Sequence, residues 1–191
     1  MSFFIRLACA TITAGLLVLP AAAVEPDQIC DFHAFTADPD PAGTNVRAGP
    51  GTSFPVLSVL PQAYGSLEFD GEFAPEFHVI GFSDGWYQIE DVSVGLYGDA
   101  EQTTIFEGPG WISSRLASFY VEDLALAAAP AADATLSVDI SSDNWQMNGP
   151  ALQAVHGCQG GFVDVTVANA AGDIARGWTN NICASQVTTC P

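Results

Sequence analysis

Short runs in which apolar and polar residues alternate recur along the chain, with glycine, proline and aspartate between them. Residues 77–82, 86–94 and 162–167 follow the period of two that places one face of an antiparallel strand in a core. Residues 56–60 are apolar on both faces and are followed by proline, so we expect a buried strand there. The pattern predicts short strands joined by tight turns, one of them a hairpin turn at 83–85.

Residues 45–57 form the most specific motif, Asn-Val-Arg-Ala-Gly-Pro-Gly-Thr-Ser-Phe-Pro-Val-Leu. Pro50 presets φ at the second position of a tight turn, and Gly51 is expected to take the positive φ that a type II turn requires next. Phe54 is expected to be extended because a proline follows it. The motif predicts a strand, a Gly-Pro-Gly turn and an extended aromatic residue that leads into the next strand.

Three segments in this order resemble the bacterial Src-homology-3-like (SH3) domain. They are the motif at 45–57, the Gly-Trp-Tyr-Gln-Ile strand at 85–89 and the Gly-Trp-Ile strand with its following turn at 110–116. The resemblance implies a small β-barrel over residues 44–120. The stretch 95–108 is longer than the corresponding hairpin of that family, so we expect a functional or mobile loop that folding does not require. Its carboxylates could suggest calcium, but their spacing matches no dense calcium-binding loop.

The second half of the chain repeats this pattern faintly. Gly161-Phe162 aligns with Gly85-Trp86, and Gly177-Trp178 aligns with Gly110-Trp111. We therefore predict an all-β fold of two small SH3-like β-barrels, the second a degenerate copy that disulfides stabilise. The expected segments are a signal peptide at 1–23, an extended lead-in at 24–43, the first barrel at 44–120, an Ala/Pro-rich linker at 121–134 and the second barrel at 135–191.

The first 23 residues have the composition of a signal peptide. One arginine precedes an apolar run at 7–19 that is too short to cross a bilayer, and Pro-Ala-Ala-Ala follows it. We expect cleavage after Ala23. Cys9 lies ahead of most of the apolar run rather than after it, which argues against lipidation. No second apolar run of membrane length follows, so we expect a periplasmic or secreted protein with no membrane span after cleavage.

Four cysteines remain after such a cleavage: Cys30, Cys158, Cys183 and Cys190. An even set in an exported chain predicts two disulfides, for which three connectivities are possible. The preferred pairing joins Cys183 to Cys190 and Cys158 to Cys30, and the other two stay open. Zinc is the competing interpretation, which the absence of a close Cys-x-x-Cys pair disfavours.

Acidic residues outnumber basic ones by 22 to 4, and the chain contains no lysine. The net charge of −18 becomes −19 when cleavage removes Arg6, the only charged residue of the first 23. Such a charge repels nucleic acid and anionic membrane surfaces, so we expect neither as a partner. It indicates either high solubility or an acidic face that covers a basic partner.

No pattern of residues points to catalysis. His156 and Cys158 lie two positions apart, but an even set of cysteines in an oxidising compartment favours a disulfide over a nucleophile. Ser113 and Ser114 lack the Gly-x-Ser-x-Gly context of a hydrolase. His78 lies in an expected strand, where a structural role is the commoner one. We therefore expect a non-enzyme with no cofactor and no metal.

Aromatic residues are the best candidates for ligand contact, and they come from the three motif segments: Phe54, Trp86, Tyr87 and Trp111. In the SH3-like family such residues line a shallow groove for peptides or peptidoglycan. The competing interpretation is that both tryptophans pack the barrel. The sequence thus predicts an exported binding module of the cell envelope that recognises peptidoglycan peptide or an envelope protein. The alternative is an acidic inhibitor or accessory protein that covers a basic secreted enzyme.

Overall fold

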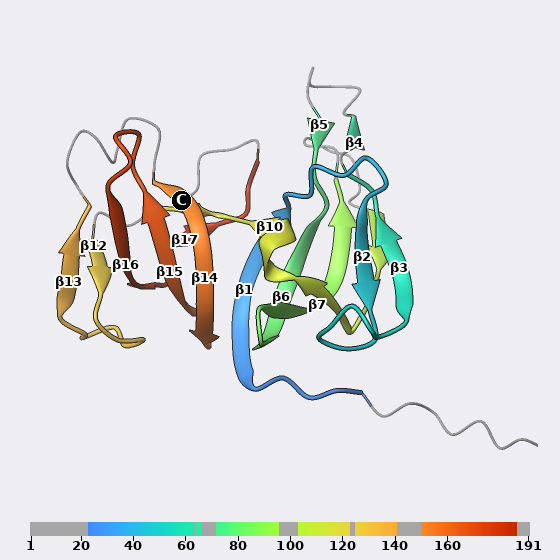
Figure 1. The fold of residues 1–191 in the computed structure, drawn as a ribbon, viewed down its shortest axis with the longest axis horizontal. Coiled ribbons are helices and arrows are strands. Elements are labelled where there is room, and N and C mark those ends of the chain that lie inside the picture. The colour runs from blue at the N-terminus through green and yellow to red at the C-terminus, as the bar shows by residue number, and fades with distance from the viewer. Residues whose placement is uncertain are drawn as a thin grey trace, which may run out of the picture.

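The structure is a computed structural model, which describes residues 23–62, 64–65, 72–95, 103–122, 125–140 and 150–186. Within these residues the chain consists of strands and one short 3-10 helix, η1 (Ser114–Leu116), and contains no α-helix. The predicted all-β class is therefore confirmed. Figure 1 shows two antiparallel sheets side by side, and the order of the described strands in neither sheet returns to its first strand.

The first sheet has eight strands in the order β10-β1-β6-β7-β9-β2-β3, with β8 paired to β7. These strands are β1 (Gln28–Thr36), β2 (Thr44–Arg47), β3 (Val56–Leu60), β6 (Glu76–Ser83), β7 (Trp86–Val94), β8 (Thr103–Phe106), β9 (Gly110–Ser113) and β10 (Ala117–Ser118). A separate small hairpin pairs β4 (Tyr64–Gly65) with β5 (Glu72–Phe73).

The second sheet has five strands in the order β13-β12-β16-β15-β14. These strands are β12 (Ala125–Ala127), β13 (Leu136–Asp139), β14 (Ala151–Gln159), β15 (Phe162–Ala168) and β16 (Ile174–Thr179). Beside it, β11 (Tyr120–Val121) pairs with β17 (Ile182–Cys183). One continuous hydrophobic core runs through both sheets, with Val79 and Ile89 from the first sheet and Val163 and Val165 from the second.

Two segments expected to lie outside the barrels contribute strands to the sheets. The lead-in at 24–43 contains β1, a strand inside the first sheet, whose alternate residues Cys30, Phe32 and Ala34 are buried. The linker at 121–134 contains β12, which pairs with β13 and β16 and buries Leu126 completely. The first segment does carry apolar residues at the strand period, whereas the second is rich in alanine, which favours strands little, so that tertiary burial decides its structure.

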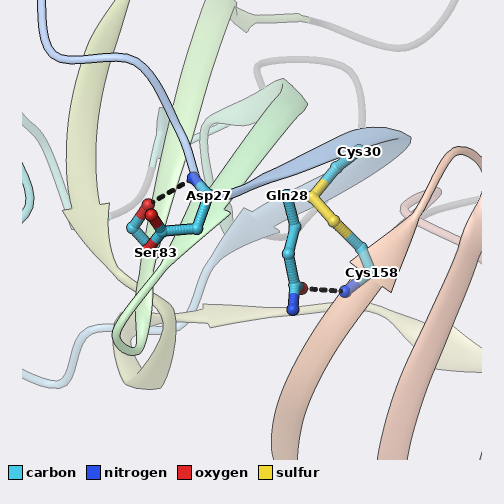
Figure 2. Close-up of a disulfide and its surroundings, with 5 residues drawn as sticks. All are labelled: Asp27, Gln28, Cys30, Ser83 and Cys158. Atoms are coloured by element: carbon cyan, nitrogen blue, oxygen red, sulfur yellow. Dashed lines mark hydrogen bonds between the residues drawn. A yellow bond between two sulfur atoms is a disulfide. The ribbon is translucent and has the colours of Figure 1, made fainter.

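Strand β1 is also the joint between the two sheets. It pairs with β6 and bonds to the turn after β14, where Asp31 N donates to Gly160 O (2.8 Å) and Gly160 N donates to Ile29 O (2.9 Å). The Cys30–Cys158 disulfide crosses the same contact with a Cα–Cα distance of 5.4 Å. Figure 2 shows this bridge beside the side chain of Gln28, whose Oε1 accepts a hydrogen bond from Cys158 N (2.9 Å).

The preferred pairing of Cys30 with Cys158 is therefore confirmed. Cys183 is disulfide-bonded as well. Cys190, with which we predicted it to pair, lies outside the described residues.

The aligned motifs of the two halves occupy equivalent register positions. The β6–β7 hairpin closes with Ser83 opposite Trp86, and the β14–β15 hairpin closes with Gln159 opposite Phe162. The first turn, Asp84-Gly85, has positive φ at both residues, as a type I′ hairpin turn requires, so the predicted turn is confirmed. Gln88 lies opposite Trp111 in the first sheet, just as Asp164 lies opposite Trp178 in the second.

Each of these hairpins also contains a β-bulge at the same place. The register skips one residue between Val79 and Gly81 on β6 and one between Val155 and Gly157 on β14. A Cβ at Gly81 would lie 2.5 Å from Pro26 Cβ, and a Cβ at Gly157 would lie 2.5 Å from Gln28 Oε1. The two glycines let the segment that enters β1 pass between the hairpins in close contact with both.

The motif at 45–57 folds differently from expectation. Strand β3 was predicted to be buried, but it is the last strand of its sheet, and Val56, Leu57 and Val59 are about half exposed. The φ of Gly51 is not positive, so the predicted type II turn is wrong. Instead, Arg47 Nη1 stabilises the loop by donating to the carbonyl oxygens of Thr52 (3.1 Å) and Phe54 (2.9 Å).

We predict that Gly49→Ala destabilises this loop and that Gly51→Ala does not. A Cβ at Gly49 would overlap the ring of Phe54, whereas a Cβ at Gly51 would meet that ring at an ordinary 3.5 Å. Overpacking of this kind lowers the free energy of unfolding by about 1–3 kcal/mol. Urea unfolding of the two variants measures the difference, and equal stabilities would contradict the packing of Phe54 on Gly49.

The stretch 95–108 is only partly a loop. Residues 103–106 form β8, which pairs with residues 92–94 of β7, and Asp91 N donates to Glu107 O (2.9 Å). Ile105 and Phe106 pack against the core. Replacing the whole stretch by a short turn would therefore remove the core contacts and strand pairing of residues 103–107. Residues 96–102 lie outside the described residues.

Candidate functional site

The four aromatic residues predicted to line a groove do not form one surface. Tyr87 is 1% exposed and Trp111 is 2% exposed, so both belong to the interior. The ring of Tyr87 packs edge-on against Phe32 with the ring centroids 5.7 Å apart, and its burial raises the pKa of the hydroxyl. Alternation along β7 explains the error, because Tyr87 points to the same side as the buried Ile89.

Phe54 and Trp86 remain partly exposed. Phe54 lies against Gly49 of its own loop, and Trp86 opens β7 opposite Ser113. The interpretation in which tryptophan packs the interior therefore holds for Trp111, while Trp86 keeps an accessible part of its surface.

The structure has a cleft of about 680 Å³ that the sequence did not indicate. One wall comes from the first sheet and its 3-10 helix, and the other comes from β14 at the edge of the second sheet. The first wall is made by Ala37, Gly85, Ser114, Arg115, Ala117 and Ser118, and the second by residues 152–156.

The cleft follows from the way the two sheets are joined. The contact between β1 and β14 holds the end of β14 near Cys158 and Gly160, while β10 and η1 continue the first sheet beside the earlier part of β14 (Figure 1). In the described part of the chain, β10 pairs only with β1 and β14 pairs only with β15 along 152–156. The two walls therefore carry strand edges with unused backbone hydrogen-bonding groups.

Local hydrogen bonds position the polar side chains of the cleft. Ser114 donates to Gly85 O from both its backbone N (2.9 Å) and its Oγ (2.8 Å), which fixes η1 against the β6–β7 turn. His156 is the residue that the bulge of β14 leaves without a cross-strand partner, and its Nε2 lies 2.8 Å from Thr166 Oγ1. Bulges often re-aim a side chain towards a site.

The lining of the cleft differs in charge from the rest of the chain. Among its described residues the lining contains no aspartate or glutamate, although the chain has 22, and it contains Arg115 and His156. Arg47 and Arg176 are engaged elsewhere, the first with loop carbonyls and the second with Asp164 through two hydrogen bonds. Within the part of the chain that the structure describes, the guanidinium of Arg115 forms no ion pair or hydrogen bond.

A second polar cluster lies on β1 and β6, away from the cleft. The rings of His33 and His78 stack with centroids 5.0 Å apart, and His78 contacts Asp31 Oδ1 at 2.9 Å and Glu90 Oε1 at 3.5 Å. Partial desolvation and the neighbouring His78 lower the pKa of His33. Stacked rings do not direct their nitrogens to one point, and no group of three His, Cys, Asp or Glu among the described residues could hold a metal ion.

The arrangement offers binding chemistry. The thiol of Cys158, the one nucleophile considered from the sequence beside a histidine, is part of a disulfide. No helix among the described residues is both long and apolar enough to cross a membrane. Comparison with known proteins adds nothing further, because no family model, no curated protein and no solved structure matches the chain.

Proposed function

We propose that this chain is an exported, non-catalytic binding module of the cell envelope that holds a peptidoglycan peptide in the cleft between β14 and β10. The observation that carries the proposal is the pair of open strand edges facing one cleft of about 680 Å³. The resemblance of 45–57, 85–89 and 110–116 to the bacterial SH3-like domain, and of the second half to a degenerate copy of it, supports an envelope role. The Cys30–Cys158 disulfide agrees with an oxidising compartment.

An extended peptide is the ligand that such walls suit. A peptide can add to the edge of a sheet by forming backbone hydrogen bonds, while its alternate side chains enter pockets on either side. Here the edge at 152–156 offers the backbone groups, and the partly buried side chains of Leu152 and Val155 offer apolar contact. The first wall adds the hydroxyl groups of Ser114 and Ser118.

The size of the cleft favours a short peptide over a folded protein. A volume of about 680 Å³ lies inside the usual range of small-ligand pockets, roughly 300–1,000 Å³. A stable interface between folded proteins instead buries about 1,200–2,000 Å² in total. A peptidoglycan stem peptide is short and extended, and it therefore meets the requirement.

Binding of soluble peptidoglycan fragments to the oxidised mature protein, measured by calorimetry, tests the proposal. The variant Ala154→Trp fills the cleft, whereas Ala151→Trp changes the same strand outside it. We expect binding by the wild type and by Ala151→Trp and at least a tenfold loss for Ala154→Trp. Unchanged binding by Ala154→Trp, or capture only of a basic protein from an envelope extract, would contradict the proposal and favour the acidic-inhibitor alternative.

A further inference from the structure

We infer that the cleft selects peptides that carry a free carboxylate, and that Arg115 is the residue that binds it. This inference rests on the proposed function, because it names the chemical group by which the peptide is recognised. It depends on the charge of the lining, the lack of a partner for Arg115 among the described residues and the polar groups on the opposite wall.

The charge of the lining determines whether a positive or a negative group of the ligand is favoured there. A chain with a net charge of −18 repels anions over most of its surface. The cleft is an exception, because its described lining has no carboxylate and combines Arg115 with His156. A negative group on a ligand is therefore tolerated there, and charge complementarity of this kind determines specificity more than affinity.

Arg115 has the chemistry and the freedom that carboxylate binding requires. A guanidinium presents donors in a planar fork that matches a carboxylate in a two-bond geometry. The guanidinium groups of Arg47 and Arg176 already donate hydrogen bonds within the chain. Arg115, by contrast, is exposed on η1 and has no partner among the described residues. The backbone beneath it is held by the two bonds from Ser114 to Gly85, so little ordering of the main chain opposes binding.

The opposite wall supplies further donors. The Nε2 atom of His156 hydrogen-bonds with Thr166 Oγ1, which orients the ring, and Nδ1 is a donor in the tautomer in which Nε2 accepts that bond. Gln153 contributes an amide on the same strand, whose nitrogen also donates to Ala151 O at 3.4 Å. A peptide that pairs along 152–156 would thus lie with polar groups of β14 on one side and the Arg115 guanidinium on the other.

The experiment compares two peptides and three proteins. The peptides are a synthetic stem tetrapeptide with free carboxylates and the same peptide with every carboxylate converted to an amide. The proteins are the oxidised wild type, Arg115→Gln and the matched control Arg176→Gln, which removes the same charge on β16 outside the cleft. Arg115→Lys serves as the conservative variant, since lysine keeps the charge and loses the fork.

We expect Arg115→Gln to weaken binding of the acid peptide about 10- to 100-fold, in line with a hydrogen bond to a charged group. The amide peptide should bind weakly to the wild type and equally weakly to Arg115→Gln. Arg176→Gln should bind both peptides as the wild type does, and Arg115→Lys should recover part of the loss. Thermal melts should show all variants folded, because Arg115 and Arg176 are exposed.

Two results would overturn the inference, and they are distinguishable from failure of the proposed function. Equal binding of acid and amide peptides, or full binding by Arg115→Gln, would remove the carboxylate-recognition role and leave the peptide-binding module intact. Absence of binding of either peptide to the wild type would overturn the proposed function and the inference with it.

Discussion

Replacing Cys30 and Cys158 together by serine should lower the free energy of unfolding by about 2–5 kcal/mol, one of the two largest effects expected for this chain. The two cysteines are 128 residues apart, so the disulfide restricts a long loop of the unfolded chain. A long loop loses more entropy on closure than a short one. The bridge also joins β1 to β14 where only a few backbone bonds connect the two sheets.

Urea unfolding followed by tryptophan fluorescence measures this effect. A matched control is Ser83→Ala, which removes the 2.8 Å bond from Asp27 N to Ser83 Oγ at the entry to β1 (Figure 2) and should cost only about 1 kcal/mol. A double cysteine variant as stable as the wild type would contradict the role of the disulfide as the joint. Two separate unfolding transitions in that variant would show that the sheets fold independently once the bridge is absent.

The substitution Trp111→Ala should lower the free energy of unfolding by about 3–5 kcal/mol, because it deletes a large side chain that is 2% exposed. Trp178→Ala is the matched control. It changes the residue at the equivalent register position of the second sheet, where the tryptophan lies opposite Asp164 and stays partly exposed. We expect it to cost clearly less, since less apolar area returns to water.

The same unfolding assay compares the two tryptophan variants. Equal losses would contradict the different burial of Trp111 and Trp178. If Trp111→Ala were as stable as the wild type but bound ligand less well, Trp111 would belong to the aromatic groove that the sequence suggested.

Local patterns were sufficient to predict the central hairpins. The alternation at 77–82 and 86–94 matches β6 and β7, and the Asp84-Gly85 turn closes them as expected. These features depend on neighbouring residues alone, which is why a sequence can reveal them. The preferred pairing of Cys30 with Cys158 was also right, although the residues did not exclude its alternatives.

Features that depend on distant partners were not predictable. Cys30, Phe32 and Ala34 alternate in β1, but nothing in the sequence pairs this segment with β6 or places it beside β14. Strand β3 has the sequence of a buried strand, although no described strand covers its outer edge. The cleft arises only where the edge of β14 meets β10 and η1, which are joined through β1. Arg115 could have been noticed as one of four basic residues, but nothing in the sequence places it opposite His156.

Backbone amide shifts of the isotope-labelled, oxidised protein during titration with the acid stem tetrapeptide test the central claim most directly. The account predicts that the largest changes fall on residues 114–118 and 152–156, the two walls of the cleft, and that they saturate together. Changes confined to Phe54, Trp86 and their neighbours would place the ligand on the first sheet alone. That result, or no saturable change anywhere in the chain, would contradict a peptide site between the two sheets.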